Sequence, residues 1–276
     1  MRRSLAILGA LAATAGCGHE LPVDREPPPR QLLPAERAVG EALARLREDP
    51  ENLRLRLAYA EELRAAGASG RAEREYRAVL RRHPEHTASR CALAEILRYA
   101  GRPGAAERQA RLAARGAPRS ALACDRLGRA LLALGRKREA EEAFLRAVEL
   151  DPMAAAARLD LGRLLFESGR YDAAEREMAT LARAQPANPQ AFHNLALIRL
   201  ARADLAGARR AITQLIGLTP RRPKVWLLAG RLAEAEGDAR RARRAYKRAL
   251  ALDPGHEEAR ACLARLRGRP EPADSE

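Results

Sequence analysis

Proline recurs at a fixed spacing of 34 residues, and this feature constrains the fold of the chain more than any other. Self-similarity at a period of roughly 20–50 residues is typical of solenoids, in which each module packs only against its neighbours. Because proline cannot continue a helix, we expect each of these prolines to end one module and to start the next. Seven prolines keep the spacing without an insertion: Pro50, Pro84, Pro118, Pro152, Pro186, Pro220 and Pro254.

Small residues keep the same 34-residue register. A glycine suits the turn that ends a helix, and an alanine lets two antiparallel helices approach closely. Large apolar residues four positions apart lie on one helix face, which predicts two amphipathic helices in each module. The glycine column is Gly67, Gly101, Gly135, Gly169, Ala203 and Gly237, and the alanine column is Ala72, Ala106, Ala140, Ala174, Ala208 and Ala242.

These columns resemble the tetratricopeptide repeat. Residues 121–154 follow the family pattern closely, with Gly128, Gly135, Ala140 and Pro152 at the expected positions. The resemblance implies an all-α fold, a right-handed superhelical solenoid of antiparallel helix pairs. It assigns an N-terminal half-repeat helix to 34–52, six repeats of 34 residues to 53–256, a C-terminal capping helix to 257–267 and a disordered tail to 268–276.

A few positions depart from the family pattern. Arg56, Arg90 and Arg158 stand where the family usually has tryptophan. Arg199 replaces an apolar residue, and Ala203 replaces the turn glycine. Because the last two fall in one module, we expect the fifth repeat to be less regular than the others.

The first residues have the features of an export signal. Two arginines precede an apolar run over residues 5–15, which is too short to span a bilayer as an anchor. The segment 14–17 then resembles a bacterial lipobox, although Thr14 departs from the usual leucine or valine. This resemblance implies a lipoprotein signal peptide at 1–16, lipid attachment at Cys17 and, from Gly18, an outer-membrane protein that faces the periplasm. The proline-rich residues 17–33 are predicted to be an extended tether.

Two other interpretations of the N-terminus stay open. Ordinary cleavage after Ala15 would release a soluble periplasmic or secreted protein, and a chain without export would stay in the cytosol. The charge is relevant to both, because 51 basic residues against 36 acidic ones give a formal net charge of +15. A basic balance favours acidic partners. The 3% aromatic content supplies few side chains that could stack on bases, so we do not expect nucleic acid as the main partner.

No residue pattern indicates catalysis. Signatures of serine hydrolases, zinc proteases and phosphate-binding loops are absent from the sequence, and the repeats leave no room for an enzyme domain. We therefore expect a protein that is not an enzyme and has no cofactor, metal or small-molecule substrate. His83 and His86 have the spacing of two metal ligands but no third. Cys91, Cys124 and Cys262 lack a paired motif and are predicted to be buried.

Recognition is the remaining kind of function. The resemblance implies that the first helices of the repeats line a concave groove that binds an extended peptide or a helix of a partner protein. We expect this groove to be charged in the middle and more apolar toward its C-terminal half, where Leu200, Leu227 and Leu228 join it. Glu95 and Tyr99 are also expected on it. The predicted partner-binding residues are Arg98, Asp125, Arg126, Arg129, Asp160, Arg163, Phe166, His193, Asn194, Leu197, Lys224 and Arg231.

Two alternatives stay open within this groove. Arg126, Arg129 and Arg163 either grip a carboxylate or phosphate of the partner, or pair with Asp125 and Asp160 of neighbouring helices. The apolar leucines either form a binding patch or are buried between repeats.

Exported repeat lipoproteins of this shape resemble the pilotins that help type IV pilus secretins assemble, and adaptors that recruit cell-wall enzymes. The sequence therefore predicts a lipid-anchored adaptor in the cell envelope. The alternative is a soluble or cytosolic regulator that binds an acidic partner or nucleic acid through its basic surface, in which the densest basic run is 240–248.

Overall fold

The computed structural model describes residues 34–267, and these residues form fourteen α-helices and no strand, which confirms the predicted all-α fold. The signal peptide, Cys17, the tether and the C-terminal tail lie outside the described residues. The helices are α1 (Pro34–Glu48), α2 (Leu53–Ala65), α3 (Ser69–Arg82), α4 (Thr87–Tyr99), α5 (Pro103–Gly116), α6 (Ala121–Ala133), α7 (Lys137–Leu150), α8 (Ala155–Glu167), α9 (Tyr171–Ala184), α10 (Pro189–Ala201), α11 (Leu205–Leu218), α12 (Pro223–Ala235), α13 (Ala239–Leu252) and α14 (Glu257–Arg267).

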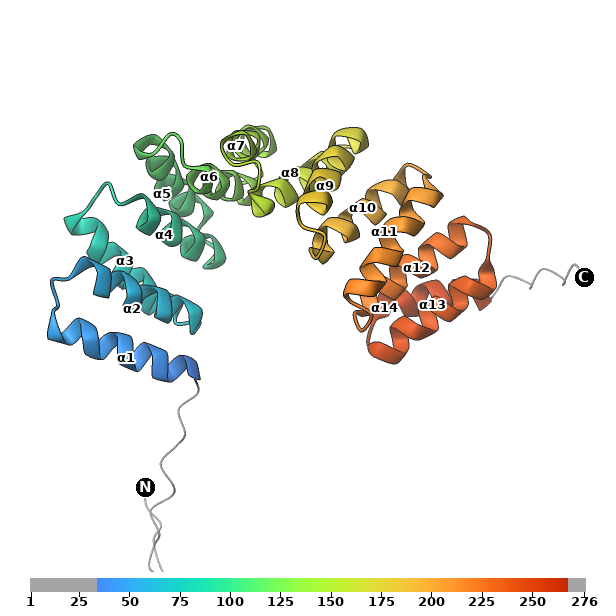
Figure 1. The fold of residues 1–276 in the computed structure, drawn as a ribbon, viewed down its shortest axis with the longest axis horizontal. Helices are drawn as coiled ribbons and strands as arrows, with labels where there is room; N and C mark the ends of the chain where they lie inside the picture. Colours follow the sequence, from blue (N-terminus) through green and yellow to red (C-terminus); the bar gives the residue numbers. More distant parts are fainter. Residues whose placement is uncertain (1–33, 268–276) are drawn as a thin grey trace, which may run out of the picture.

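The helix pairs follow one another along an arch, with α1 and α14 at its two ends (Figure 1). From α2 to α13, each pair has a first helix of 13 residues and a second helix of 14. Each second helix packs against its own first helix and against the first helix of the next pair. Neighbouring first helices also contact one another from α4 to α12, so they line one continuous side of the arch.

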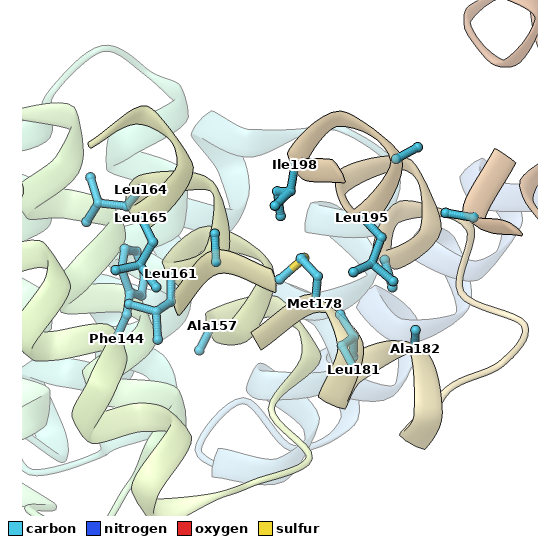
Figure 2. Packing of buried hydrophobic residues seen from close by; sticks show 14 of the residues in the cluster. Phe144, Ala157, Leu161, Leu164, Leu165, Met178, Leu181, Ala182, Leu195 and Ile198 are labelled. Carbon is cyan, nitrogen blue, oxygen red and sulfur yellow. The ribbon is translucent and has the colours of Figure 1, made fainter. Parts of the chain in front are cut away.

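The core between paired helices sets a small residue against a large one. Met178 of α9 is fully buried and reaches Gly162 of α8, where an added β-carbon would come within 2.4 Å of Met178 Cε. Gly128 of α6 meets the ring of Phe144 in the same way, at 2.6 Å. The close-up in Figure 2 shows Met178 between Leu161, on the side of α8, and Leu195 of α10. The core therefore continues from one pair to the next.

The fifth repeat keeps the regular geometry, contrary to the expectation from sequence. The turn between α10 and α11 has the same backbone hydrogen bonds as the turn between α6 and α7, where Gly135 has φ +76°. Ala203 adopts φ +58° to do so, and it is the only residue other than glycine with positive φ among residues 34–267. A left-handed conformation is costly for alanine. The packing of the helix pair therefore determines the conformation of the turn. Replacing glycine with Ala203 leaves the turn in place and strains the backbone at this residue.

Arginine takes over a structural role at the positions that lack tryptophan. Arg56 donates a hydrogen bond to the carbonyl oxygen of Pro50 at 2.7 Å and forms an ion pair with Glu75 at 2.8 Å. Arg90 likewise donates to the carbonyl oxygen of Pro84, at 2.8 Å. These contacts join the loop that enters a repeat to the second helix of that repeat. The arginines are structural residues of the solenoid and not free cations.

Candidate partner-binding groove

The first helices form a groove of about 490 Å³ on their shared side, which we call the concave groove. Four consecutive first helices, α4, α6, α8 and α10, contribute side chains to it. Of the residues predicted from sequence, Arg98, Arg129, Asp160 and Arg163 line it. Its lining is Arg98, Tyr99, Arg129, Leu132, Ala133, Ala156, Leu159, Asp160, Arg163 and Gln190.

Tyr99 is the most exposed large apolar residue of the described chain, with 72% of its surface accessible. The guanidinium carbon of Arg98 lies 4.0 Å from the centroid of the Tyr99 ring, close enough for a cation–π contact. Tyr99 stands at the C-terminal end of α4, where the first helix ends and no further turn covers the ring. An exposed aromatic ring held by a cation beside a groove is a typical anchor for a partner side chain.

A chain of ion pairs crosses the middle of the first-helix surface, and we call it the charge ladder. Arg126 lies 3.2 Å from Glu95 of α4 and 2.5 Å from Asp125. Arg129 lies 3.2 Å from Asp125 and 2.9 Å from Asp160 of α8. The ladder ends in Arg163, 3.1 Å from Asp160. Of the three arginines, Arg126 and Arg129 pair with a carboxylate of a neighbouring first helix, whereas Arg163 pairs only within its own helix.

The ladder leaves one cation in contact with solvent. The side chains of Arg126 and Arg129 are 18% and 21% exposed, whereas that of Arg163 is 54% exposed at the edge of the concave groove. Arg163 can therefore bind an additional carboxylate without breaking a buried pair. Arg126 and Arg129 mainly hold α4, α6 and α8 in register.

Burial dominates the electrostatics of Asp125. Its side chain is enclosed by α6 and its neighbours, and only 4% of the residue is exposed. Burial raises the pKa of Asp125 above its usual value, although the two adjacent guanidinium groups act in the opposite direction. The Nε of Arg126 is buried and has no hydrogen-bond acceptor among the described residues. The centre of the ladder therefore contains a charged pair that is incompletely compensated.

The predicted residues of α8 and α10 are mostly engaged within the protein. The Phe166 ring packs against Tyr171 of α9, with 5.4 Å between the ring centroids. The Asn194 side-chain nitrogen lies 3.5 Å from the sulfur of Met178. His193 is partly buried, and burial together with the charge of Lys224 lowers its pKa. None of these three lines the concave groove.

The apolar C-terminal half of the predicted groove is not an exposed patch. Leu227 and Leu228 of α12 are buried in the core, and Leu197 and Leu200 of α10 are half-buried against it. Helix α12 is apolar on more than one face because it packs against both α11 and α13. Of the two alternatives that the sequence leaves open, burial between repeats is therefore the one that holds for Leu227 and Leu228.

Two predicted cations lie near the C-terminal end of the arch. Lys224 is exposed at the N-terminal end of α12 and has no ion-pair partner among the described residues. Arg231 forms an ion pair with Glu258 of α14. The basic run of α13 lies on a second helix, where Arg241 pairs with Glu236 at 3.1 Å and Arg248 lies over the ring of Trp226.

Leu132 and Leu159 line the concave groove but did not stand out in the sequence. Both lie one position beside a buried residue, so the helical period alone does not separate them from the core.

Within residues 34–267, no three His, Cys, Asp or Glu side chains are placed to hold a metal ion together. No helix of that range has the length and apolarity needed to cross a membrane. The three cysteines are buried and unpaired, as the sequence predicts.

Comparison with known proteins agrees with this geometry. Two family models described as tetratricopeptide repeat match residues 126–189 and 223–266. Over these two stretches the chain matches the tetratricopeptide repeat. The repeats are similar to the crystal structure of PilW, described as a widely conserved type IV pilus biogenesis factor, with 24% identity and a TM-score of 0.69. That match covers 76% of this chain and 97% of PilW.

Two further solved structures share the fold. PilF of Pseudomonas aeruginosa is 20% identical, with a TM-score of 0.67, over 82% of this chain and 99% of PilF. The Cut9–Hcn1 assembly of the APC/C contains a chain that is 16% identical, with a TM-score of 0.70, over 84% of this chain and 46% of that one. No curated protein matches the sequence. At these identities the similarities show the fold alone, a solenoid of helical repeats.

Proposed function

We propose that the protein is a lipid-anchored scaffold of the cell envelope that binds a segment of a partner protein in its concave groove. The observation that carries the proposal is the exposed Tyr99 ring, held by Arg98 and placed beside the open cation of Arg163. An aromatic anchor and a solvent-exposed guanidinium favour a partner segment with an apolar side chain next to a carboxylate.

The envelope location is supported by sequence features outside the described residues. The apolar run at 5–15, the lipobox-like segment ending in Cys17 and the proline-rich residues 17–33 together fit a lipid anchor followed by a spacer. The similarity to PilW, a type IV pilus biogenesis factor, supports assembly of an envelope complex as the process that the scaffold serves.

Site-specific crosslinking tests groove binding. A photoreactive phenylalanine analogue at position 99 is expected to crosslink a partner in cells, because the side chain faces the concave groove. The same analogue at position 145 is the matched control, since Leu145 is an exposed apolar residue on the second helix α7. The variants Tyr99→Ala and Arg163→Glu are expected to reduce recovery of the partner. Equal crosslinking of one protein from both positions would contradict groove binding.

Lipid attachment is tested separately. Incorporation of radiolabelled palmitate into the wild type but not into Cys17→Ser is expected, together with recovery of the wild type in the membrane fraction.

A soluble or cytosolic regulator that binds an acidic partner is the second candidate function, and the net charge of +15 favours it. Absence of label from the wild type would favour that candidate and would leave the crosslinking result unaffected.

A further inference from the structure

A second groove lies on the opposite side of the arch, between the second helices α9 and α11, and we call it the convex hollow. Its volume is about 1190 Å³, and its floor is formed by Phe192 and Leu195 of α10. The equivalent groove between α3 and α5 has a volume of only about 290 Å³. Because both grooves are built from the same repeat geometry, side chains rather than backbone must account for the difference.

The hollow exists because small residues occupy positions that are filled in the first groove. Between α3 and α5, Leu80 projects into the groove, and Arg90 bridges it by donating to Gln109 at 3.0 Å. The residues 102 positions later, three repeats along, are Ala182, Phe192 and Ala211. No hydrogen bond joins Phe192 to α11, so the space stays open and the phenylalanine ring forms part of its floor.

The rims of the hollow are basic on both sides. Six arginines and two carboxylates line it, and both carboxylates are already bound by arginines of the same hollow, Asp172 by Arg202 and Glu175 by Arg199 and Arg202. Arg176 of α9 and Arg210 of α11 have no ion-pair partner among residues 34–267. Arg183 of α9 donates only to Thr180, at 3.4 Å. Free cations therefore face an apolar floor from both walls.

We propose that the convex hollow binds an acidic amphipathic helix of a partner protein. Apolar side chains of such a helix would cover Phe192 and Leu195, and its flanking Asp and Glu residues would meet the arginines of both rims. The chain's own C-terminal segment 268–276 is acidic but contains no large apolar residue, so it does not match the floor. A single-stranded nucleic acid matches the cations but supplies no apolar stripe. This proposal is independent of what occupies the concave groove.

The test measures binding of a fluorescein-labelled 14-residue helical peptide to the full chain by fluorescence anisotropy. The probe carries leucines at i, i+3, i+4 and i+7 with glutamates on both flanks, and a second peptide has lysines in place of the glutamates. The variant Ala182→Leu/Ala211→Gln fills the hollow with the residues that the first groove uses at these positions. The variant Arg176→Glu/Arg183→Glu reverses two rim charges, and Arg74→Glu/Arg81→Glu makes the same change at the register-matched positions of α3.

The acidic peptide is expected to bind the wild type and the α3 variant equally, and to bind the filled and rim variants at least tenfold more weakly. Affinity is also expected to fall as NaCl is raised, since the flanking pairs are exposed to solvent. Equal affinity for the wild type and both hollow variants would overturn the proposal. Equal binding of the lysine peptide, or binding of a single-stranded oligonucleotide without binding of the acidic peptide, would overturn it as well. Circular dichroism verifies that each variant is folded.

Discussion

Arg158 and Trp226 occupy the same register position in different repeats and donate to the same backbone acceptor. The guanidinium of Arg158 lies 2.8 Å from the carbonyl oxygen of Pro152, and Nε1 of Trp226 lies 2.8 Å from that of Pro220. Arg158 also forms an ion pair with Glu177 of α9. At this position arginine therefore reaches the same backbone acceptor as tryptophan, although Cys124 and Phe192 show that not every repeat has a side-chain donor here.

The first prediction follows from this equivalence. Replacing Arg158 with alanine removes two hydrogen bonds of a buried cation and leaves Glu177 unpaired, so it should lower the free energy of unfolding by about 2–4 kcal/mol. Arg158→Trp should be milder, because the indole donor can reach Pro152. Urea denaturation followed by circular dichroism measures both. A loss for Arg158→Trp as large as that for Arg158→Ala would contradict the equivalence.

Ala203→Gly should stabilise the protein. Relief of the left-handed conformation at φ +58° gains about 1–2 kcal/mol, and the greater freedom of glycine in the unfolded chain removes about 0.4–1 kcal/mol of this. The net expectation is an increase of between about 0 and 1.6 kcal/mol. Gly135→Ala is the matched control at the same turn position, and it should destabilise by a similar amount. Thermal denaturation of the two variants measures both signs.

Gly128→Ala and Gly162→Ala should differ in effect although they occupy the same column. The new methyl at position 128 meets the rigid ring of Phe144, whereas at position 162 it meets the flexible end of Met178. Overpacking costs about 1–3 kcal/mol, and the better helix propensity of alanine returns about 1 kcal/mol. We expect Gly162→Ala to be nearly neutral and Gly128→Ala to be destabilising. Equal urea midpoints for the two variants would show that the Phe144 ring moves as readily as Met178.

Asp125→Asn should gain stability relative to the wild type as the pH rises. Burial raises the pKa of Asp125 in the folded protein, so the folded state binds the proton more tightly than the unfolded state does. This contribution is fully present below the ordinary value of 3.8 and is lost as the pH rises through the folded value. The difference in unfolding free energy between the two proteins should shift toward the asparagine variant as the pH rises above the ordinary value of 3.8. A difference that shifts toward the wild type would show that the arginines outweigh burial.

Cys91 should resist alkylation in the folded protein. Burial raises the pKa of the Cys91 thiol to about 11, so only about one molecule in a thousand carries the reactive thiolate at pH 8. A short iodoacetamide pulse followed by peptide mass mapping should show labelling of Cys91 at least 100-fold slower in buffer than in urea. Similar rates in the two solutions would mean that α4 opens on the time scale of the pulse.

The sequence predicts the repeat framework and several residues of the concave groove, but neither the ion pairs within that groove nor the convex hollow. The 34-residue columns are set by helix packing, so Gly135 and Ala140 locate the turns and the close contacts without coordinates. The pairing of Arg129 with Asp160 depends on how neighbouring first helices are spaced, which the period does not specify. Leu227 shows the same limit, because a helix that is packed on two sides buries residues that a single amphipathic face would expose.

The convex hollow illustrates a different limit. Part of its signal was present in the sequence, since Ala182 stands where Leu80, Val148, Ile216 and Leu250 occur in other repeats, with Ala114 the other small residue of this column. A family pattern directs attention to positions that match it, whereas this groove arises where a large apolar side chain is replaced by alanine. Comparison of the repeats with one another, position by position, would have found it.

The distribution of ion pairs has a mechanical consequence. Bending or straightening the arch changes the separation of adjacent first helices. An ion pair that bridges two of these helices therefore resists the motion. Such bridges join α4 to α6, α6 to α8 and α12 to α14, whereas no ion pair within residues 34–267 joins α10 to α8 or to α12. Compliance on the first-helix side should therefore be higher between α2 and α4, which no ion pair within residues 34–267 bridges either, and around α10, the helix whose opposite side forms the floor of the convex hollow.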